Sequence, residues 1–245
     1  MRKSNVLFIG IILPLFVFVS CTNSSNKKKN SEFEGTISIS GAFALYPLTV
    51  KWADEYQKLH PKVRIDISAG GAGKGMVDAL SGMVDLGMFS RGISDPEKAK
   101  GCWWVAVAKD AVLPTMNVQN PLSGKIKSGG INGSQFENIF INGGIEEWGR
   151  LYNLTGNYPM NIYTRSDACG AAQMWGEFLG KDQESLIGIG VFGDPGMADA
   201  TKRDKFGIGY NNVIYIYDLK SRKCYEGLDV IPIDLNNNGT VDEDE

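Results

Sequence analysis

Three glycine-rich turns separate β-like from helix-like segments and constrain the fold of this chain more than any other feature. They span residues 41–47, 70–75 and 165–171. Each follows a short strand-like run and precedes a run with helical periodicity, which is the order of a βα unit. A helix N-terminus carries unpaired N–H groups and a positive dipole end, so three converging turns would suit one small oxyanion. Ordinary βα loops are also often glycine-rich, which leaves a purely structural role open.

The spacing of apolar residues predicts an α/β fold with mainly parallel sheets flanked by helices. Strands expected at 36–40, 63–68 and 84–89, the last of them buried, alternate with helices expected at 47–59 and 76–83. Further elements are expected in this order: strands at 103–108 and 112–118, helices at 136–141 and 145–148, a strand at 160–164, helices at 171–179 and 194–205, and strands at 208–217 and 230–233. We expect four aromatic residues in the core: Trp52, Tyr56, Trp148 and Trp175.

The first 20 residues are typical of an export signal. Basic Arg2 and Lys3 precede an apolar run of about 14 residues, which is too short for an ordinary membrane-spanning helix. The junction at Ser20 resembles a bacterial lipoprotein signal, in which Cys21 becomes the lipidated first residue; a plain secretory signal is the alternative. Residues 21–34 then form a polar tether. We expect a cell-envelope protein, periplasmic or on the outer face, that the lipid alone holds to the membrane.

Charge and histidine content argue against several classes of function. The chain has 245 residues with 25 Lys+Arg, 28 Asp+Glu and a net charge of −3; without Arg2 and Lys3 the balance is 23 − 28 = −5. No basic stripe is present, so we expect no nucleic-acid partner. The single histidine, His60, precedes Pro61 at a helix end and has no catalytic motif beside it. We therefore expect a monomeric binding protein and no enzyme.

Three cysteines remain after Cys21, namely Cys102, Cys169 and Cys224. Their spacing matches neither a disulfide framework nor a zinc site, so we expect free thiols with at most one pair. Cys169 lies where a helix is expected to begin, and a helix N-terminus lowers a thiol pKa. A Cys169-dependent enzyme is therefore the minor alternative.

The last twelve residues match the calcium loop of EF-hand proteins. Oxygen-bearing side chains, a glycine at position 6 and an acidic residue at position 12 occur at the spacing that this loop requires. We expect a structural Ca²⁺ site, with an acidic solvated tail as the alternative. Its ligands would be Asp234, Asn236, Asn238, the Thr240 carbonyl, Asp242 and Glu245.

Several segments resemble, in one order, the bacterial phosphate-binding proteins of ABC transporters. The similar segments are residues 41–58, 70–73, 84–91, 106–110, 117–121, 136–140, 147–148, 165–167 and 207–210. The resemblance implies the two-lobed fold of type II periplasmic binding proteins. It also implies that the chain captures phosphate or a related oxyanion and delivers it to an ABC permease.

The resemblance divides the chain into residues 35–110 as lobe 1, 111–228 as lobe 2 with the crossings between lobes, and 229–245 as a return strand and calcium loop. Binding proteins of this type usually return to the first lobe and finish with helices. We therefore expect either a chain truncated after Glu245 or an unusually short family member.

In that family, hydroxyls, helix-end N–H groups and one arginine hold the ligand. Arg165 matches the arginine, and we expect Asp167 to orient it. Arg91 stands where many relatives carry an aspartate that accepts the proton of hydrogen phosphate. The implied contacts are Ala42, Phe43, Ala44, Gly71, Ala72, Gly73, Ser90, Arg91, Arg165, Ser166, Cys169, Gly170 and Ala171.

The chain departs from the family where hydroxyl groups are usual. Ala42, Phe43 and Ala44 replace a Ser/Thr-rich first turn, and Cys169 and Ala171 replace hydroxyls of the third. Each lost hydrogen bond removes roughly 0.5–1.5 kcal/mol of net binding energy. A different oxyanion, or a ligand with an apolar portion, is therefore compatible with the turns. The alternative function is a sensing or surface-interaction module whose oxyanion site is altered or lost.

Overall fold

The computed structural model describes residues 33–243. The predicted export signal at 1–20, Cys21, most of the tether and Glu245 lie outside the described residues. Among the described residues, no helix combines the length and apolar character needed to cross a membrane. Cys102, Cys169 and Cys224 are free thiols.

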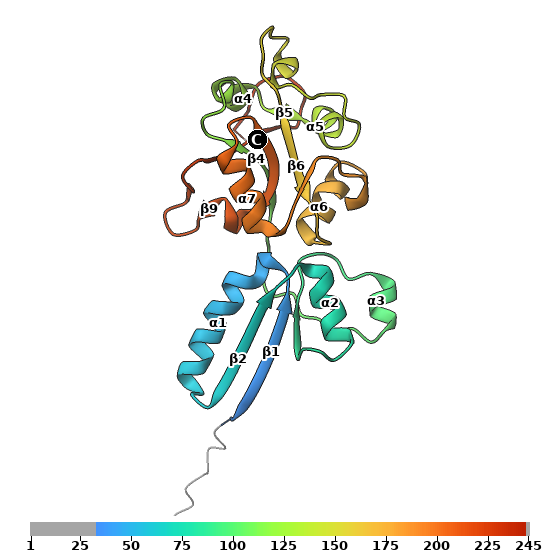
Figure 1. Ribbon diagram of the computed structural model, residues 1–245, viewed down its shortest axis with the longest axis vertical. Helices are drawn as coiled ribbons and strands as arrows, with labels where there is room; N and C mark the ends of the chain where they lie inside the picture. Colours follow the sequence, from blue (N-terminus) through green and yellow to red (C-terminus); the bar gives the residue numbers. More distant parts are fainter. Residues whose placement is uncertain (1–32, 244–245) are drawn as a thin grey trace, which may run out of the picture. The chain divides into compact units, whose positions relative to one another are not determined.

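The first lobe is built on a parallel three-stranded sheet in the order β2-β1-β3 (Figure 1). Its strands are β1 (Gly35–Gly41), β2 (Val63–Ala69) and β3 (Leu86–Met88). Helix α1 (Tyr46–Leu59), with Pro47 in its first turn, packs on β2, and α2 (Ala72–Leu80) packs on β1 and β3. Proline suits a first helical turn, where its missing N–H costs nothing. The predicted βαβαβ order of this lobe is confirmed.

The ends of these strands bring the first two glycine-rich turns together. The N–H groups of Gly70 and Gly71 both donate to the carbonyl oxygen of Gly41. A Cβ at Gly41 would lie 2.2 Å from the carbonyl oxygen of Met88. Only a residue without a side chain allows this approach, so glycine at this position lets α2 sit close over the sheet.

The second lobe contains a mixed five-stranded sheet in the order β11-β4-β8-β6-β7. Strand β4 is antiparallel to β8 and β11, whereas β6 is parallel to β7 and β8. The bounds of its elements are β4 (Val112–Asn117), β6 (Asn161–Arg165), β7 (Ile189–Val191), β8 (Gly207–Asn212), β11 (Leu228–Val230), α4 (Ser123–Gly129), α5 (Gly133–Phe140), α6 (Gly170–Phe178) and α7 (Gly193–Arg203).

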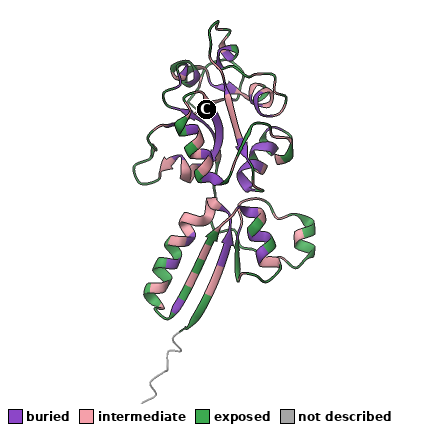
Figure 2. Ribbon diagram, in the orientation of Figure 1, coloured by how far each residue is buried: buried purple, intermediate pink, exposed green. Residues whose placement is uncertain are grey.

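The larger hydrophobic core lies in this second lobe (Figure 2). Trp148 and Tyr210 are fully buried, and Trp175 stacks on Tyr210 with ring centroids 5.7 Å apart. Phe136 and Phe140 meet Trp175 edge to face. Such aromatic pairs each add roughly 0.5–1.5 kcal/mol beyond the burial of their area. The prediction of a core position is confirmed for Trp148 and Trp175.

The remaining elements are short. They are α3 (Asp95–Ala99), β5 (Ile131–Asn132), β9 (Tyr217–Asp218), β10 (Lys223–Cys224), β12 (Ile233–Asp234) and the 3₁₀ turns at Phe43–Leu45, Trp148–Tyr152, Gln183–Ser185 and Val213–Tyr215. Strand β11 pairs with β4, and β12 pairs with β5. Residues 229–245 were expected to contain a return strand. Their strands pair with β4 and β5, which follow residue 110 in the sequence.

Several local predictions are wrong. Residues 103–108 form no strand and are exposed, because no neighbouring strand pairs with them among the described residues. The expected helix at 145–148 is absent, and a 3₁₀ turn begins at Trp148 instead. Strand β3 buries Met88 but leaves Leu86 half exposed. Trp52 and Tyr56 are exposed because the helix α1 covers the small sheet with other residues.

Candidate functional site

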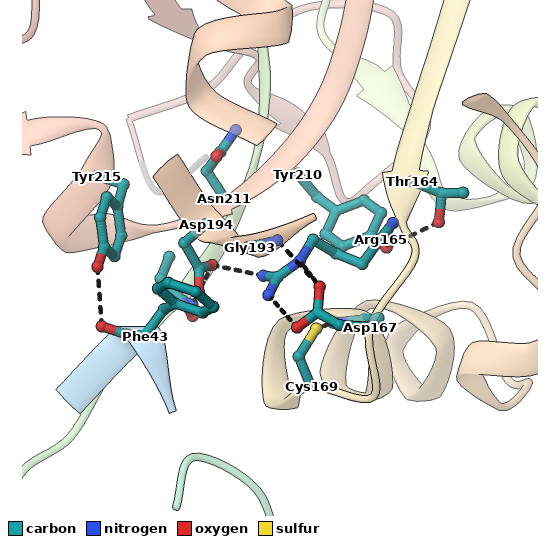
Figure 3. Close-up of polar contacts among 12 residues, drawn as sticks. Phe43, Thr164, Arg165, Asp167, Cys169, Gly193, Asp194, Tyr210, Asn211 and Tyr215 are labelled. Carbon is teal, nitrogen blue, oxygen red and sulfur yellow. Dashed lines mark hydrogen bonds and ion pairs between the residues drawn. The ribbon is translucent and has the colours of Figure 1, made fainter. Parts of the chain in front are cut away.

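Arg165 is the centre of the candidate site, at the last residue of β6 (Figure 3). Its Nε and Nη2 donate to the two carboxylate oxygens of Asp167 at 2.8 and 2.7 Å. Its Nη1 lies 2.9 Å from Oδ1 of Asp194. The Arg165 side chain is 0% exposed, so these partners replace all of its contact with water. The predicted orienting contact from Asp167 to Arg165 is present.

The two carboxylates are themselves held in place. Asp167 Oδ1 accepts the N–H of Gly193 at 3.0 Å, and Asp194 Oδ1 accepts the Nδ2 amide of Asn212 at 2.6 Å. Burial raises the pKa of Asp194, against the opposing effect of Arg165. One guanidinium thus faces two carboxylates in a buried cluster whose formal charge is −1 when both are ionised.

One donor atom of Arg165 is held by an ion pair without a well-aligned hydrogen bond. Nη1 reaches ion-pair distance to Asp194, yet it makes no well-aligned hydrogen bond to any described residue. Hydrogen-bond strength falls steeply with angle, so this contact is mainly an ion pair. A well-aligned acceptor, such as an oxyanion oxygen, would give this donor a stronger hydrogen bond.

The second and third glycine-rich turns meet beside Arg165. The N–H of Gly73 donates to the carbonyl oxygen of Ala168 at 3.1 Å. A Cβ at Gly71 would lie 2.8 Å from Asp167 Oδ2, and one at Gly170 would lie 2.0 Å from the Ser90 carbonyl oxygen. The two helix N-termini, of α2 and α6, are therefore brought together across the two lobes.

Phe43 of the first turn also reaches the second lobe. Its ring lies against the backbone of Gly193, and its carbonyl oxygen accepts the hydroxyl of Tyr215 at 2.9 Å. Its ring centroid is 5.9 Å from the guanidinium carbon of Arg165. All three turns thus contribute residues to one region. Of the expected contacts, those that take part in this junction or are buried next to it are Ala42, Phe43, Gly71, Ala72, Gly73, Ser90, Arg165, Cys169, Gly170 and Ala171.

Two expected contacts point elsewhere. Arg91 forms a two-point ion pair with Glu97, with Nη2 2.7 Å from Oε1, and its guanidinium lies over the ring of Phe89. Arg91 lowers the pKa of Glu97 to about 2, and this short-range pairing explains why Arg91 does not face Arg165. Ser166 is exposed and lies beside Gly190 of β7, because successive residues of an extended chain point to opposite faces. A third expected contact, Ala44, is half-buried on the 3₁₀ segment Phe43–Leu45.

The pKa of the Cys169 thiol is raised, whereas the sequence predicted a lowered one. Burial raises the pKa of Cys169 to about 12, despite Arg165 and the N–H of Ala172, which act in the opposite direction. The prediction of a lowered pKa at this helix N-terminus is therefore wrong. Desolvation of the thiolate outweighs the favourable helix end, and the thiol is unsuited to nucleophilic attack.

Sequence reasoning missed the fourth turn, at the start of α7. Gly193 and Asp194 contribute to the Arg165 cluster, and Phe192 contacts Phe43, but the run Asp194-Pro195-Gly196 indicated only a helix start. Tyr215 and Asn212 were missed as well. The available signal was the position of this turn, which lies between a strand and a helix like the other three.

The C-terminal loop folds around Asp234, which is buried. Its two carboxylate oxygens accept the N–H groups of Asn238 and Gly239 at 3.1 and 3.0 Å. The side chains of Asn236 and Asn238 both donate to Asp242 Oδ2, at 2.7 and 3.0 Å. Within residues 33–243, no group of three or more His, Cys, Asp or Glu side chains is placed to hold a metal ion. The loop instead combines two carboxylates with amides.

The sequence matches a PBP superfamily domain over residues 26–241. A protein of Methanocaldococcus jannaschii named phosphate-binding protein PstS is 24% identical, with 89% of this chain and 65% of that protein covered. A protein of the same name from Pseudomonas aeruginosa is 27% identical, with 77% and 62% covered. The chain thus spans somewhat less than two thirds of these relatives' length.

Solved structures share the fold. One from Clostridium perfringens, described as a phosphate ABC transporter substrate-binding protein with bound phosphate, superposes with a TM-score of 0.70 at 23% identity, covering 82% of this chain and 76% of that one. A phosphate transport receptor from Vibrio cholerae gives 0.54 at 16% identity, covering 80% and 76%. The two-lobed α/β fold expected from the sequence is confirmed. With a family match that covers most of its length, the chain belongs to the PBP superfamily.

Proposed function

We propose that this protein binds phosphate or a related oxyanion and delivers it to an ABC permease. One observation carries the proposal: the buried Nη1 of Arg165, at the junction of glycine-rich turns, has no well-aligned acceptor among residues 33–243. Arginine binds tetrahedral oxyanions through paired N–H groups. The names of the relatives, which describe phosphate-binding proteins, support the choice of ligand.

Isothermal titration of the chain lacking residues 1–20 tests this function against phosphate, sulfate, molybdate and tungstate. We expect binding of at least one anion and its loss in Arg165→Lys, which keeps the charge but cannot keep the paired geometry. Arg203→Ala is the matched control, since Arg203 is exposed and pairs with Asp199 at the surface. A folded wild-type protein that binds none of the four anions would contradict the proposal.

A sensing or surface-interaction role on the same fold is the second candidate. The observation that favours it is that two buried carboxylates, Asp167 and Asp194, already neutralise the charge of Arg165. Such a protein would remain silent in the titration, with native circular dichroism. A binding constant for any of the four anions would exclude a lost site.

We propose that Cys21 anchors the protein to the cell envelope through a lipid. The basic, apolar and Ser-Cys segments of the first 21 residues support this. The full-length protein should fractionate with membranes, and Cys21→Ser should release it to the soluble fraction. Retention of Cys21→Ser in the membrane fraction would contradict lipid anchoring.

We also propose a structural Ca²⁺ site in the loop that begins at Asp234. The pattern of oxygen side chains favours a hard cation, and the side chains of Asn236, Asn238 and Asp242 converge. Chelation should lower the melting temperature and leave anion affinity nearly unchanged, because Arg165 lies in a separate cluster. Asn236→Ala should remove the calcium effect, whereas identical melting with and without calcium would rule the site out.

A further inference from the structure

Phe43 lies directly against the residues that would receive the anion (Figure 3). It belongs to the first glycine-rich turn, on the short 3₁₀ segment Phe43–Leu45 of the first lobe. Its contacts, however, are with the second lobe: Gly193, Phe192, Tyr215 and Arg165. The position of Phe43 therefore depends on how the two lobes meet.

The ring and the backbone of Phe43 are both held. The ring packs edge to face on Phe192, with centroids 5.8 Å apart. A Cβ added to Gly193 would lie 3.0 Å from the ring, so the ring fits against a backbone that has no side chain. The Tyr215 hydroxyl donates to the Phe43 carbonyl at 2.9 Å. These contacts keep the ring beside Arg165.

The aromatic ring of Phe43 disfavours anion binding beside Arg165. The guanidinium of Arg165 lies within cation–π range of the ring, at 5.9 Å. The ring offers no hydrogen-bond donor, and its electron-rich face repels negative charge. Because the Arg165 side chain is wholly buried, an anion cannot reach it unless a neighbouring group moves. Asp167 and Asp194 hold Arg165 from the same lobe, whereas Phe43 contacts it from the first lobe. Movement of the lobes would therefore withdraw Phe43.

We propose that Phe43 covers Arg165 and competes with the anion, so that this residue limits the affinity of the site for a bare oxyanion. The inference rests on the proposed oxyanion-binding function. Opening of the lobes withdraws Phe43, and closure returns it. Bare phosphate must then bind against the attraction between the ring and Arg165, and replacement of the ring by a small hydroxyl residue would supply a donor in its place.

The test is a gain of affinity. In titrations with inorganic phosphate, Phe43→Ser should bind about tenfold more tightly than wild type or better, as expected for one added hydrogen bond to a charged ligand. Phe43→Leu keeps an apolar side chain and should show no comparable gain. Phe178→Ser is the matched control, because Phe178 is a half-exposed phenylalanine on α6 that contacts Trp175 and not Arg165.

A second variant leaves the ring in place. Tyr215→Phe removes only the hydroxyl that holds the Phe43 carbonyl, and it should raise phosphate affinity in the same direction by a smaller factor. The double variant Phe43→Ser/Arg165→Lys should lose the gain, since the effect acts through the guanidinium. Circular dichroism establishes that each variant is folded.

The outcomes separate the inference from the function on which it rests. Equal phosphate affinity of wild type, Phe43→Ser and Tyr215→Phe would overturn the role of Phe43 and leave oxyanion binding intact. Binding by Phe43→Ser but not by wild type would support the role of Phe43 and show that the native site is closed to phosphate. Silence of every folded variant toward all four anions would overturn the proposed function and, with it, this inference.

Discussion

Arg165 and its two carboxylates show how burial changes the chemistry of single residues. A guanidinium removed from water requires close partners, and Asp167 and Asp194 supply them at 2.7 and 2.9 Å. With both carboxylates ionised the cluster carries a formal charge of −1, and with only one of them ionised it is neutral. Burial also changes the acidic groups nearby: it raises the pKa of the Asp194 carboxyl and of the Cys169 thiol.

The first prediction concerns the pH dependence of stability at Asp194. Burial raises its pKa above the ordinary value of 3.8, so the folded protein binds this proton more tightly than the unfolded chain. The stability that this provides is present at low pH and is lost as the pH rises through the folded-state pKa. Asp194→Asn should therefore gain stability relative to wild type as the pH rises from 3.8 toward neutrality. Urea unfolding across that range measures the difference.

The control for this prediction is Asp199→Asn, on the same helix. Asp199 is exposed and pairs with Arg203 at the surface, where an ion pair contributes roughly 0–1 kcal/mol. A stability difference between Asp194→Asn and wild type that does not change with pH would contradict the assignment.

At the scale of elements, the glycine-rich turns act through close contact as well as through their N–H groups. Gly41 allows α2 to approach the sheet, and Gly170 allows the start of α6 to approach the Ser90 backbone. The expected anion cradle combined these N–H groups with Arg165 and with the hydroxyls of Ser90 and Ser166. In the structure one of the N–H groups, that of Gly73, already donates to Ala168 across the two lobes.

Gly170→Ala provides the second prediction. The added Cβ would meet the Ser90 carbonyl at 2.0 Å, while the backbone at residue 170 has no positive φ that would strain an alanine. We expect the two lobes to separate without unfolding. Small-angle X-ray scattering should show a larger radius of gyration, and phosphate affinity should fall.

Gly124→Ala is the corresponding control in α4, where an added Cβ meets nothing within 4 Å. It should leave the radius of gyration unchanged and stabilise the helix by roughly 0.5–1 kcal/mol. An unchanged radius and unchanged affinity for Gly170→Ala would show that this contact does not control how the lobes meet.

At the scale of the whole molecule, the two sheets differ in how much core supports them. A large cluster that includes Trp148, Trp175 and Tyr210 supports the second sheet. The cluster beneath the first sheet has far fewer buried members, among them Ile39 and Met88. The exposed apolar residues 103–107 follow this first sheet in the sequence.

Hydrogen exchange tests this difference, and it is the third prediction. Regions with few buried apolar contacts open at lower free energy, so amides of β1 and β3 should exchange faster than those of β4 and β8. Exchange measured by mass spectrometry on native protein resolves the strands. Equal protection of both sheets would show that they unfold as one cooperative unit.

The order of strands and helices was readable from the sequence because it depends on local periodicity and on turns between elements, and the family was recognised from the resemblance of several segments to phosphate-binding proteins. Strands β1, β2 and β6 and helices α1 and α7 follow from such patterns. The strand expected at 103–108 did not form, because a strand needs a pairing partner that local pattern cannot supply. Arg165 and Asp167 were identified because residues 165–167 resemble a ligand loop of that family.

Only the tertiary structure decided what surrounds Arg165. Asp194 and Tyr215 lie far from it in sequence, and burial, which raises the pKa of Cys169, is a property of the packed chain. The pairing of Arg91 with Glu97 and the contact of Phe43 with Gly193 likewise arise from three-dimensional proximity. The sequence by itself determined the kind of protein and its central arginine. Tertiary packing decided which groups compete for that arginine, because the interactions that do so act over a few ångströms in space and not along the chain.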